Sequence, residues 1–122
     1  MLINLSNHPS TLWSEEQKEA ALSFGKTIDI PFPTVDPAGK ETYIKELAND
    51  YFEKIKNFSQ HNNFSDITVH LMGEMTFVYA LLQKLNEAGI RAIASTTQRQ
   101  TKDFGDGQKE SLFKFVQFRS YY

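Results

Sequence analysis

The sequence has no cysteine among its 122 residues, which excludes disulfide bonds, thiolate nucleophiles and zinc sites built on cysteine. The chain also has no surplus of positive charge, because 13 Lys and Arg residues stand against 15 Asp and Glu residues and give a net charge of −2. Binding a long nucleic acid needs a broad positive field. We therefore expect no long nucleic acid as partner, and any polyanion that binds is expected to be small or to meet a local basic patch.

Long apolar runs and a secretion signal are also absent. No segment approaches the roughly 20 apolar residues that a membrane helix needs. The apolar start, residues 1–5, has no basic leader and ends within one short run. The length is typical of one domain with its own core and leaves no room for a separate catalytic domain. We therefore expect a single domain over residues 1–122, without membrane contact, in a soluble cytoplasmic protein.

The most informative stretch covers residues 66–95. It opens with a β-branched apolar run over residues 67–72, breaks at Gly73 and continues with apolar residues at helical spacing. A glycine closes that helix, and residues 90–94 form a second apolar run. This pattern predicts a β-α-β unit. Its right-handed crossover places the loops after parallel strands at one edge of the sheet, where open α/β proteins bind ligands.

The same alternation of strands and helices precedes this unit. Residues 1–5 and 27–30 have the composition of short buried strands. Ser14 begins a capping-box pattern ahead of a helix that ends at a glycine. Residues 40–58 carry apolar side chains every three or four positions and predict the clearest helix. Residues 61–65 form a polar connection into the β-α-β unit.

The C-terminal part predicts an antiparallel hairpin. After Ser95 the chain is polar, has two glycines near the expected tip and leads into an aromatic-rich strand over residues 111–122. No crossover helix fits between these strands, so the last one must return antiparallel. We predict an α/β fold, a compact Rossmann-like β-α-β-α-β-α-β-β sheet that is mostly parallel with an antiparallel C-terminal strand. The expected strand order is second, first, third, fourth and fifth.

In this order the chain moves first to one side of the first strand and then to its other side. The topological switch point therefore lies between the first and third strands, and a ligand is expected there. His8 can titrate near neutral pH. Residues 73–76 open a helix, whose free N–H groups and partial positive charge suit a phosphate. Alternatively, His8 is a solvent-exposed loop residue, and Glu74 or Thr76 only caps the helix. The candidate ligand-binding residues at this point are Ser6, Asn7, Ser10, Gly73, Glu74 and Thr76, beside His8.

A third polar segment follows the fourth expected strand. Hydroxyl, amide and guanidinium groups suit phosphate and sugar oxygens, because hydroxyls donate without charge and Arg binds phosphate as a fork. Alternatively, this segment is a polar hairpin arm in which Arg99 pairs with a nearby aspartate. His70 lies inside a strand and is expected to be a core residue that a neighbour satisfies. The candidate residues of the third segment are Ser95, Thr96, Thr97, Gln98 and Arg99.

Several other functions lack their patterns. The carboxylates Asp29, Asp36 and Glu74 show no ligand spacing and no His pair lies four residues apart, so we expect no metal and no cofactor. Glycine-rich dinucleotide and P-loop patterns are absent, as is the serine-hydrolase elbow. The last strand carries more aromatic residues than one sheet face needs. A symmetric homodimer is therefore expected to cover that edge.

On residues 6–10, 73–76 and 95–99, the sequence resembles the CRISPR-associated Rossmann-fold (CARF) sensor domains and the small stand-alone ring-nuclease-like proteins related to them. The resemblance extends over most of the chain through topology. It implies a homodimer that binds a cyclic oligoadenylate, a small cyclic oligonucleotide, across its two-fold axis. It further implies a role in CRISPR antiviral defence, in which a member without an effector domain degrades that messenger.

The resemblance also implies a metal-independent reaction in which a ribose 2′-hydroxyl attacks the adjacent phosphate. Arg99 would then stabilise the phosphorane, His8 would act as general acid or base, and residues 73–76 would hold the phosphate. The sequence departs from this pattern because its first loop has no cluster of Lys or Arg. The competing interpretation is a non-enzymatic module that binds a small nucleotide, or only a protein partner through the aromatic strand.

Overall fold

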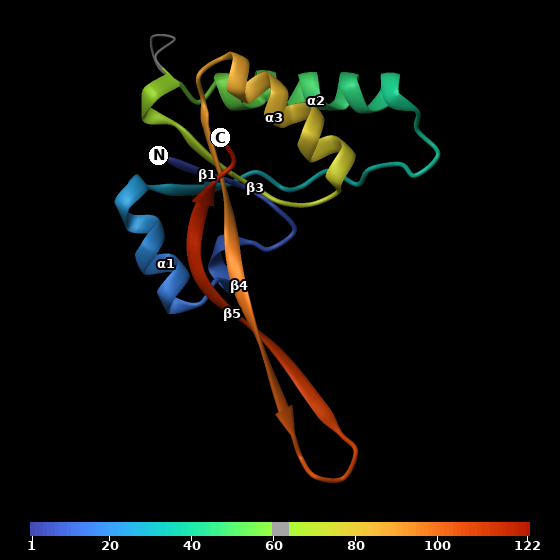
Figure 1. Cartoon of the computed structure of the whole chain (residues 1–122). Coiled ribbons are helices and arrows are strands. Elements are labelled where there is room, and N and C mark those ends of the chain that lie inside the picture. The colour runs from blue at the N-terminus through green and yellow to red at the C-terminus, as the bar shows by residue number, and fades with distance from the viewer. Residues whose placement is uncertain (60–63) are drawn as a thin grey trace.

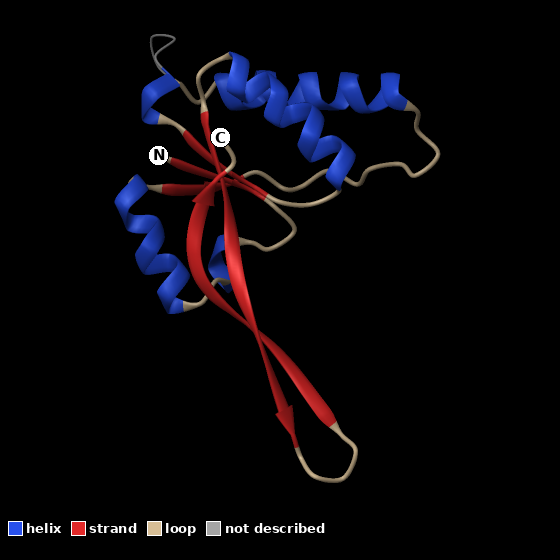
Figure 2. Ribbon diagram, in the orientation of Figure 1, coloured by secondary structure: helices blue, strands red, loops and turns tan. Residues whose placement is uncertain are grey.

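The computed structural model describes residues 1–59 and 64–122 and contains one five-stranded sheet in the order β2-β1-β3-β4-β5 (Figure 2). The pairs β1–β2, β1–β3 and β3–β4 are parallel, and β4–β5 is antiparallel. The predicted α/β sheet, mostly parallel with an antiparallel last strand, is therefore confirmed. The strands are β1 (Leu2–Leu5), β2 (Thr27–Asp29), β3 (Thr68–Leu71), β4 (Arg91–Asp103) and β5 (Lys109–Ser120).

Helices cover both faces of the sheet (Figure 1). The helices α2 (Glu41–Lys56) and α3 (Met75–Glu87) pack on one face, where the larger apolar core lies, and α1 (Glu15–Ala21) packs on the other with a smaller core around Trp13. The described residues also form three short 3-10 helices: η1 (Ser10–Leu12), η2 (Leu22–Phe24) and η3 (Phe64–Asp66). Of the polar connection predicted over 61–65, residues 61–63 lie outside the described part.

Local sequence signals explain where these helices begin and end. The Ser14 hydroxyl accepts a hydrogen bond of 3.2 Å from the Gln17 N–H and caps α1, as the sequence predicts. Gly25 ends the following 3-10 turn with a φ of 91°, a backbone conformation that favours glycine. In α3, residues Phe77, Leu81 and Leu85 are fully buried at four-residue spacing. None of the helices in the described part of the chain is long and apolar enough to span a membrane.

The β4–β5 pair extends far beyond the sheet as a two-stranded arm (Figure 1). The sequence placed the end of the fourth strand near Ala94, but β4 continues to Asp103, which corrects that expectation. Residues 95–99 therefore lie within a strand and not in a turn after it. The reason is the pairing partner: the ladder with β5 continues to the Asp103–Lys109 pair, with one irregularity between Thr96 and Thr97.

Candidate functional site

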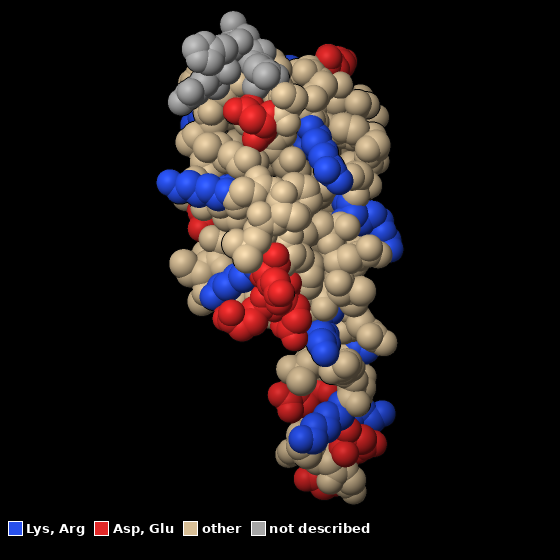
Figure 3. All heavy atoms as spheres, turned by 90° about the vertical axis from the view of Figure 1, so that its left-hand side faces the viewer, with Lys and Arg blue, Asp and Glu red and all other residues tan. Residues whose placement is uncertain are grey.

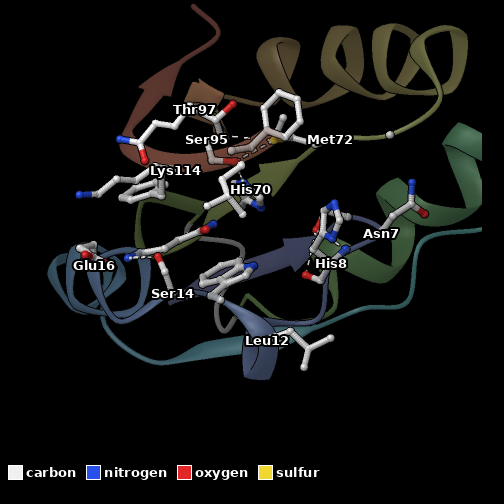
Figure 4. A pocket seen from close by; sticks show the side chains of 18 residues that line it. Asn7, His8, Leu12, Ser14, Glu16, His70, Met72, Ser95, Thr97 and Lys114 are labelled. Carbon is white, nitrogen blue, oxygen red and sulfur yellow. Dashed lines mark hydrogen bonds between the residues drawn. The ribbon is translucent and has the colours of Figure 1, made fainter. Parts of the chain in front are cut away.

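An open pocket of about 900 Å³ lies where β1 and β3 end, between α1 and the start of the arm (Figure 4). The segment after β1, the segment after β3 and the middle of β4 all contribute to its lining. The topology brings them together because the carboxyl ends of neighbouring parallel strands meet at one edge. Among the residues proposed from the sequence, those that line this pocket are Ser6, Asn7, His8, Gly73, Ser95 and Thr97.

The other proposed residues lie outside the lining: Ser10, Glu74, Thr76, Thr96, Gln98 and Arg99. The Ser10 N–H and hydroxyl both donate to the Asp29 carboxylate, at 3.1 and 2.8 Å. The Thr96 hydroxyl donates to the Gln117 carbonyl at 3.2 Å across the arm. These two residues hold neighbouring segments of the protein together.

Glu74 occupies the N-terminus of α3. Its carboxylate accepts hydrogen bonds from the N–H groups of Thr76 and Phe77, at 3.0 and 2.9 Å, and from the Thr76 hydroxyl. The Thr76 hydroxyl, followed by these two N–H groups, lowers the pKa of Glu74. The N–H groups that would face a phosphate are therefore bonded to a carboxylate of the same chain. Glu74 caps the helix, which is the alternative stated above for Glu74 and Thr76.

Arg99 lies on the arm beside the pocket. Its guanidinium donates to the Ser111 hydroxyl through Nη2 at 3.0 Å and Nε at 3.3 Å. In the antiparallel ladder Arg99 is directly opposite Phe113, which lines the pocket. Residues directly opposite each other share one face of a ribbon. Arg99 thus lies outside the lining but opposite a lining residue, with its guanidinium bonded to a neutral partner.

A polar row, buried at Asn4 and His70 and exposed at Asp29, runs beneath the pocket and was not predicted as part of the site. The Asn4 amide donates to the Asp29 carboxylate at 2.7 Å, and the Asn4 Oδ1 atom lies 2.9 Å from His70 Nδ1. The other ring nitrogen, Nε2, lies 3.3 Å from the Ser95 hydroxyl. The usable sequence signal was Asn4 as the single polar residue of β1, and His70 as the one titratable residue of the short buried strand β3.

His70 is a satisfied core residue, as expected, and it also lines the pocket. It packs edge-on against Trp13, with ring centroids 5.3 Å apart. Burial, and secondarily the charge of His8, lowers the pKa of His70 from its ordinary 6.5 to about 4. The ring is therefore neutral at physiological pH.

Aromatic and charged side chains that were not proposed from the sequence complete the walls. Trp13 comes from the segment before α1, and Phe113 and Phe115 come from the arm. Lys114 brings an ammonium group to one side and Glu16 a carboxylate to the α1 side (Figure 4). On the face shown in Figure 3, acidic and basic side chains are interspersed. Within residues 1–59 and 64–122, no three side chains gather that could hold a metal ion.

The fold and the site define a class: an α/β protein with one five-stranded sheet and a polar, aromatic-lined pocket at the carboxyl ends of its parallel strands. Within that class the chain belongs to the family described as uncharacterized protein MJ1673, whose model matches residues 1–119. Comparisons with curated proteins and with solved structures found no match.

Proposed function

We propose that this protein binds a cyclic oligoadenylate in the pocket, as a homodimer, and cleaves it without a metal ion. One observation carries the proposal: polar groups from three segments far apart in sequence line one pocket together with aromatic rings. Its volume of about 900 Å³ is at the upper end of the range of about 300–1,000 Å³ for small-molecule sites. The ligand class comes from the CARF resemblance, together with the Rossmann-like topology that we propose for the sheet.

The lining suits the parts of such a ligand. Adenine rings stack on aromatic side chains, and Phe113 and Phe115 offer such surfaces. The Lys114 ammonium can pair with a phosphate. Small hydroxyl and amide groups at Ser6, Asn7 and Thr97 match sugar and phosphate oxygens. The wall therefore combines stacking, charge and hydrogen bonding, as a nucleotide requires.

The arm supports the dimer part of the proposal. Leu112, Phe113 and Val116 are 53%, 68% and 55% exposed. A two-stranded ribbon on its own is marginally stable in water, and exposed apolar strands associate with other chains. A second copy that packs on the arm would cover these side chains and place two pockets around one axis. A ring with matching symmetry could then contact both.

The proposed reaction is an internal displacement. The ribose 2′-hydroxyl attacks the adjacent phosphorus, the bond from phosphorus to the 5′-oxygen breaks, and a 2′,3′-cyclic phosphate and a 5′-hydroxyl result. His8, which lines the pocket, moves the protons. Arg99 exchanges its neutral Ser111 partner for the developing charge, since bonds between charged groups are stronger. In this proposal the protein acts in the cytoplasm and ends a CRISPR antiviral signal.

A second candidate function is binding without cleavage. Two observations favour it: the guanidinium of Arg99 is already bonded to Ser111, and the Glu74 carboxylate occupies the N–H groups at the start of α3. The protein would then be a sensor or a store of the nucleotide. It would need the same pocket and the same dimer.

Incubation with labelled cyclic tetra-adenylate in EDTA tests both functions. The enzyme produces linear products, and Arg99→Ala and His8→Ala reduce the rate at least tenfold. Arg91→Ala is the matched control, because Arg91 lies at the opposite end of β4 and outside the pocket lining. Retention of the intact ring without products identifies the non-enzymatic module. Absence of both binding and cleavage refutes the proposal.

A further inference from the structure

The orientation of the Asn4 amide is fixed by two groups that can only accept hydrogen bonds. Its Nδ2 atom lies 2.7 Å from the Asp29 carboxylate and 2.9 Å from the His8 carbonyl. Neither partner carries a hydrogen, so the NH₂ end of the amide must face them. The Oδ1 end therefore faces the opposite way, where His70 Nδ1 and the Ser6 hydroxyl lie 2.9 Å from it.

This orientation determines the tautomer of His70. Asn4 Oδ1 is an acceptor, so the hydrogen of the neutral imidazole must be on Nδ1. Burial disfavours the charged ring and lowers the pKa of His70 to about 4, so the ring is neutral. The second nitrogen, Nε2, is then an unprotonated acceptor that points at Ser95.

The Ser95 hydroxyl has one hydrogen and two neighbours that could accept it. Nε2 of His70 lies at 3.3 Å and the thioether sulfur of Met72 at 3.0 Å. An imidazole nitrogen is a much stronger acceptor than a thioether sulfur, so the hydrogen points to His70. The lone pairs of the Ser95 oxygen are left for the pocket that this residue lines.

We propose that the row Asp29–Asn4–His70 makes Ser95 a fixed hydrogen-bond acceptor in the pocket, so that Ser95 selects ligands that present a hydroxyl donor. For a nucleotide that donor is the ribose 2′-hydroxyl, the group that distinguishes RNA from DNA. A phosphate oxygen has no hydrogen to give and is repelled at this position. Ser95 thus contacts sugar and not phosphate, and His70 and Asn4 are positioning residues. This inference rests on the proposed function.

Binding of cyclic tetra-adenylate and of its all-2′-deoxy counterpart tests the selection. The wild-type protein binds the ribose ring roughly tenfold more tightly or better, since the deoxy ring leaves the Ser95 oxygen unpaired. In Ser95→Ala this ratio falls close to one. Ser23→Ala is the matched control that keeps the ratio, because the Ser23 hydroxyl is bonded to the Ala20 carbonyl outside the pocket. Equal wild-type affinity for both rings overturns the inference and leaves the proposed function standing, whereas failure to bind either ring overturns both.

The row Asp29–Asn4–His70 can also be tested without a ligand. The ¹⁵N shifts of His70 report its tautomer, and the Nδ1–H form is expected from pH 5.5 to 8. Asp29→Asn removes one of the two acceptor-only partners of the Asn4 amide and leaves the His8 carbonyl, so the amide can turn over in a fraction of the molecules. A mixture of tautomers with a smaller ribose preference should follow, although Asp29 lies outside this pocket. The proposed role of the row is overturned if His70 of the wild-type protein is in the Nε2–H form. It is also overturned if Asp29→Asn changes neither the tautomer nor the ribose preference.

Discussion

Replacing Gly73 by alanine tests whether this glycine is needed for packing as well as for the pocket. A Cβ atom at this position would lie 2.2 Å from Cζ, 2.4 Å from Cε2 and 2.7 Å from Cε1 of Phe32. Carbon atoms in contact are about 3.5–4.0 Å apart, so the ring would have to move by more than about 1 Å. Phe32 packs edge-on against Phe77, with centroids 5.3 Å apart, and that contact would be disturbed.

The cost follows from two opposing effects. Overpacking of this kind lowers the free energy of unfolding by about 1–3 kcal/mol. Loss of glycine flexibility in the unfolded chain returns about 0.4–1 kcal/mol. We therefore expect Gly73→Ala to destabilise the protein by about 1–2 kcal/mol, which lowers the midpoint of urea unfolding by roughly 1 M.

Urea unfolding followed by circular dichroism measures this change, and a double-mutant cycle with Phe32→Ala identifies its cause. In the Phe32→Ala background the clash is absent, so adding Gly73→Ala should be neutral or slightly stabilising. An equal loss of stability in both backgrounds, or no loss in the wild-type background, would refute the packing explanation. The glycine would then have to be explained by the pocket alone.

Three further predictions concern the pH dependence, the helix cap and the arm. The pKa of His70 is about 6.5 in the unfolded chain and about 4 in the folded protein. The free energy of unfolding therefore falls as the pH drops through this window, by about 3 kcal/mol in total. In His70→Asn the free energy of unfolding should change much less between pH 4 and 7. Glu74→Ala should cost about 1 kcal/mol, or about 4 °C in Tm at pH 7. Since the folded pKa of Glu74 is lowered, this difference in Tm should shrink as the pH falls through that pKa. For the proposed homodimer, Phe113→Ser should shift sedimentation from dimer to monomer, whereas Lys109→Ser should not.

The layout of the sheet could be predicted because each element has its own local signal. Short apolar runs, apolar residues at helical spacing and a glycine at the end of a helix depend only on neighbours in sequence. Gly89, for example, ends α3 with a φ of 73°. The length of β4 could not be predicted in this way, because residues 95–103 are polar and become a strand only through pairing with β5.

The site could be predicted only to the level of segments. Parallel topology places the ends of β1 and β3 together, so Ser6, His8 and Gly73 share the pocket. Which donor bonds which acceptor depends on side-chain distances that a linear pattern does not contain. Glu74 therefore looked like a ligand-binding residue although its carboxylate bonds its own helix, and His70 looked like a core residue although it also reaches the pocket.

The polar row also specifies how the parallel strands align. β1 and β3 are buried along their whole length, so apolar burial alone discriminates poorly between registers. In the observed register Asn4 is opposite both Asp29 and His70. A slip of one residue would place Val69 or Leu71 opposite Asn4 and turn the His70 ring toward the apolar core under α2 and α3. The buried polar groups would then be unpaired, at a cost of about 1–3 kcal/mol each. The hydrogen bonds that orient Ser95 thus also align the strands that lead to Ser6, His8 and Gly73. Replacing Asn4 should therefore impair folding and ligand selection together. Replacing the exposed Asp29 can impair ligand selection without impairing folding.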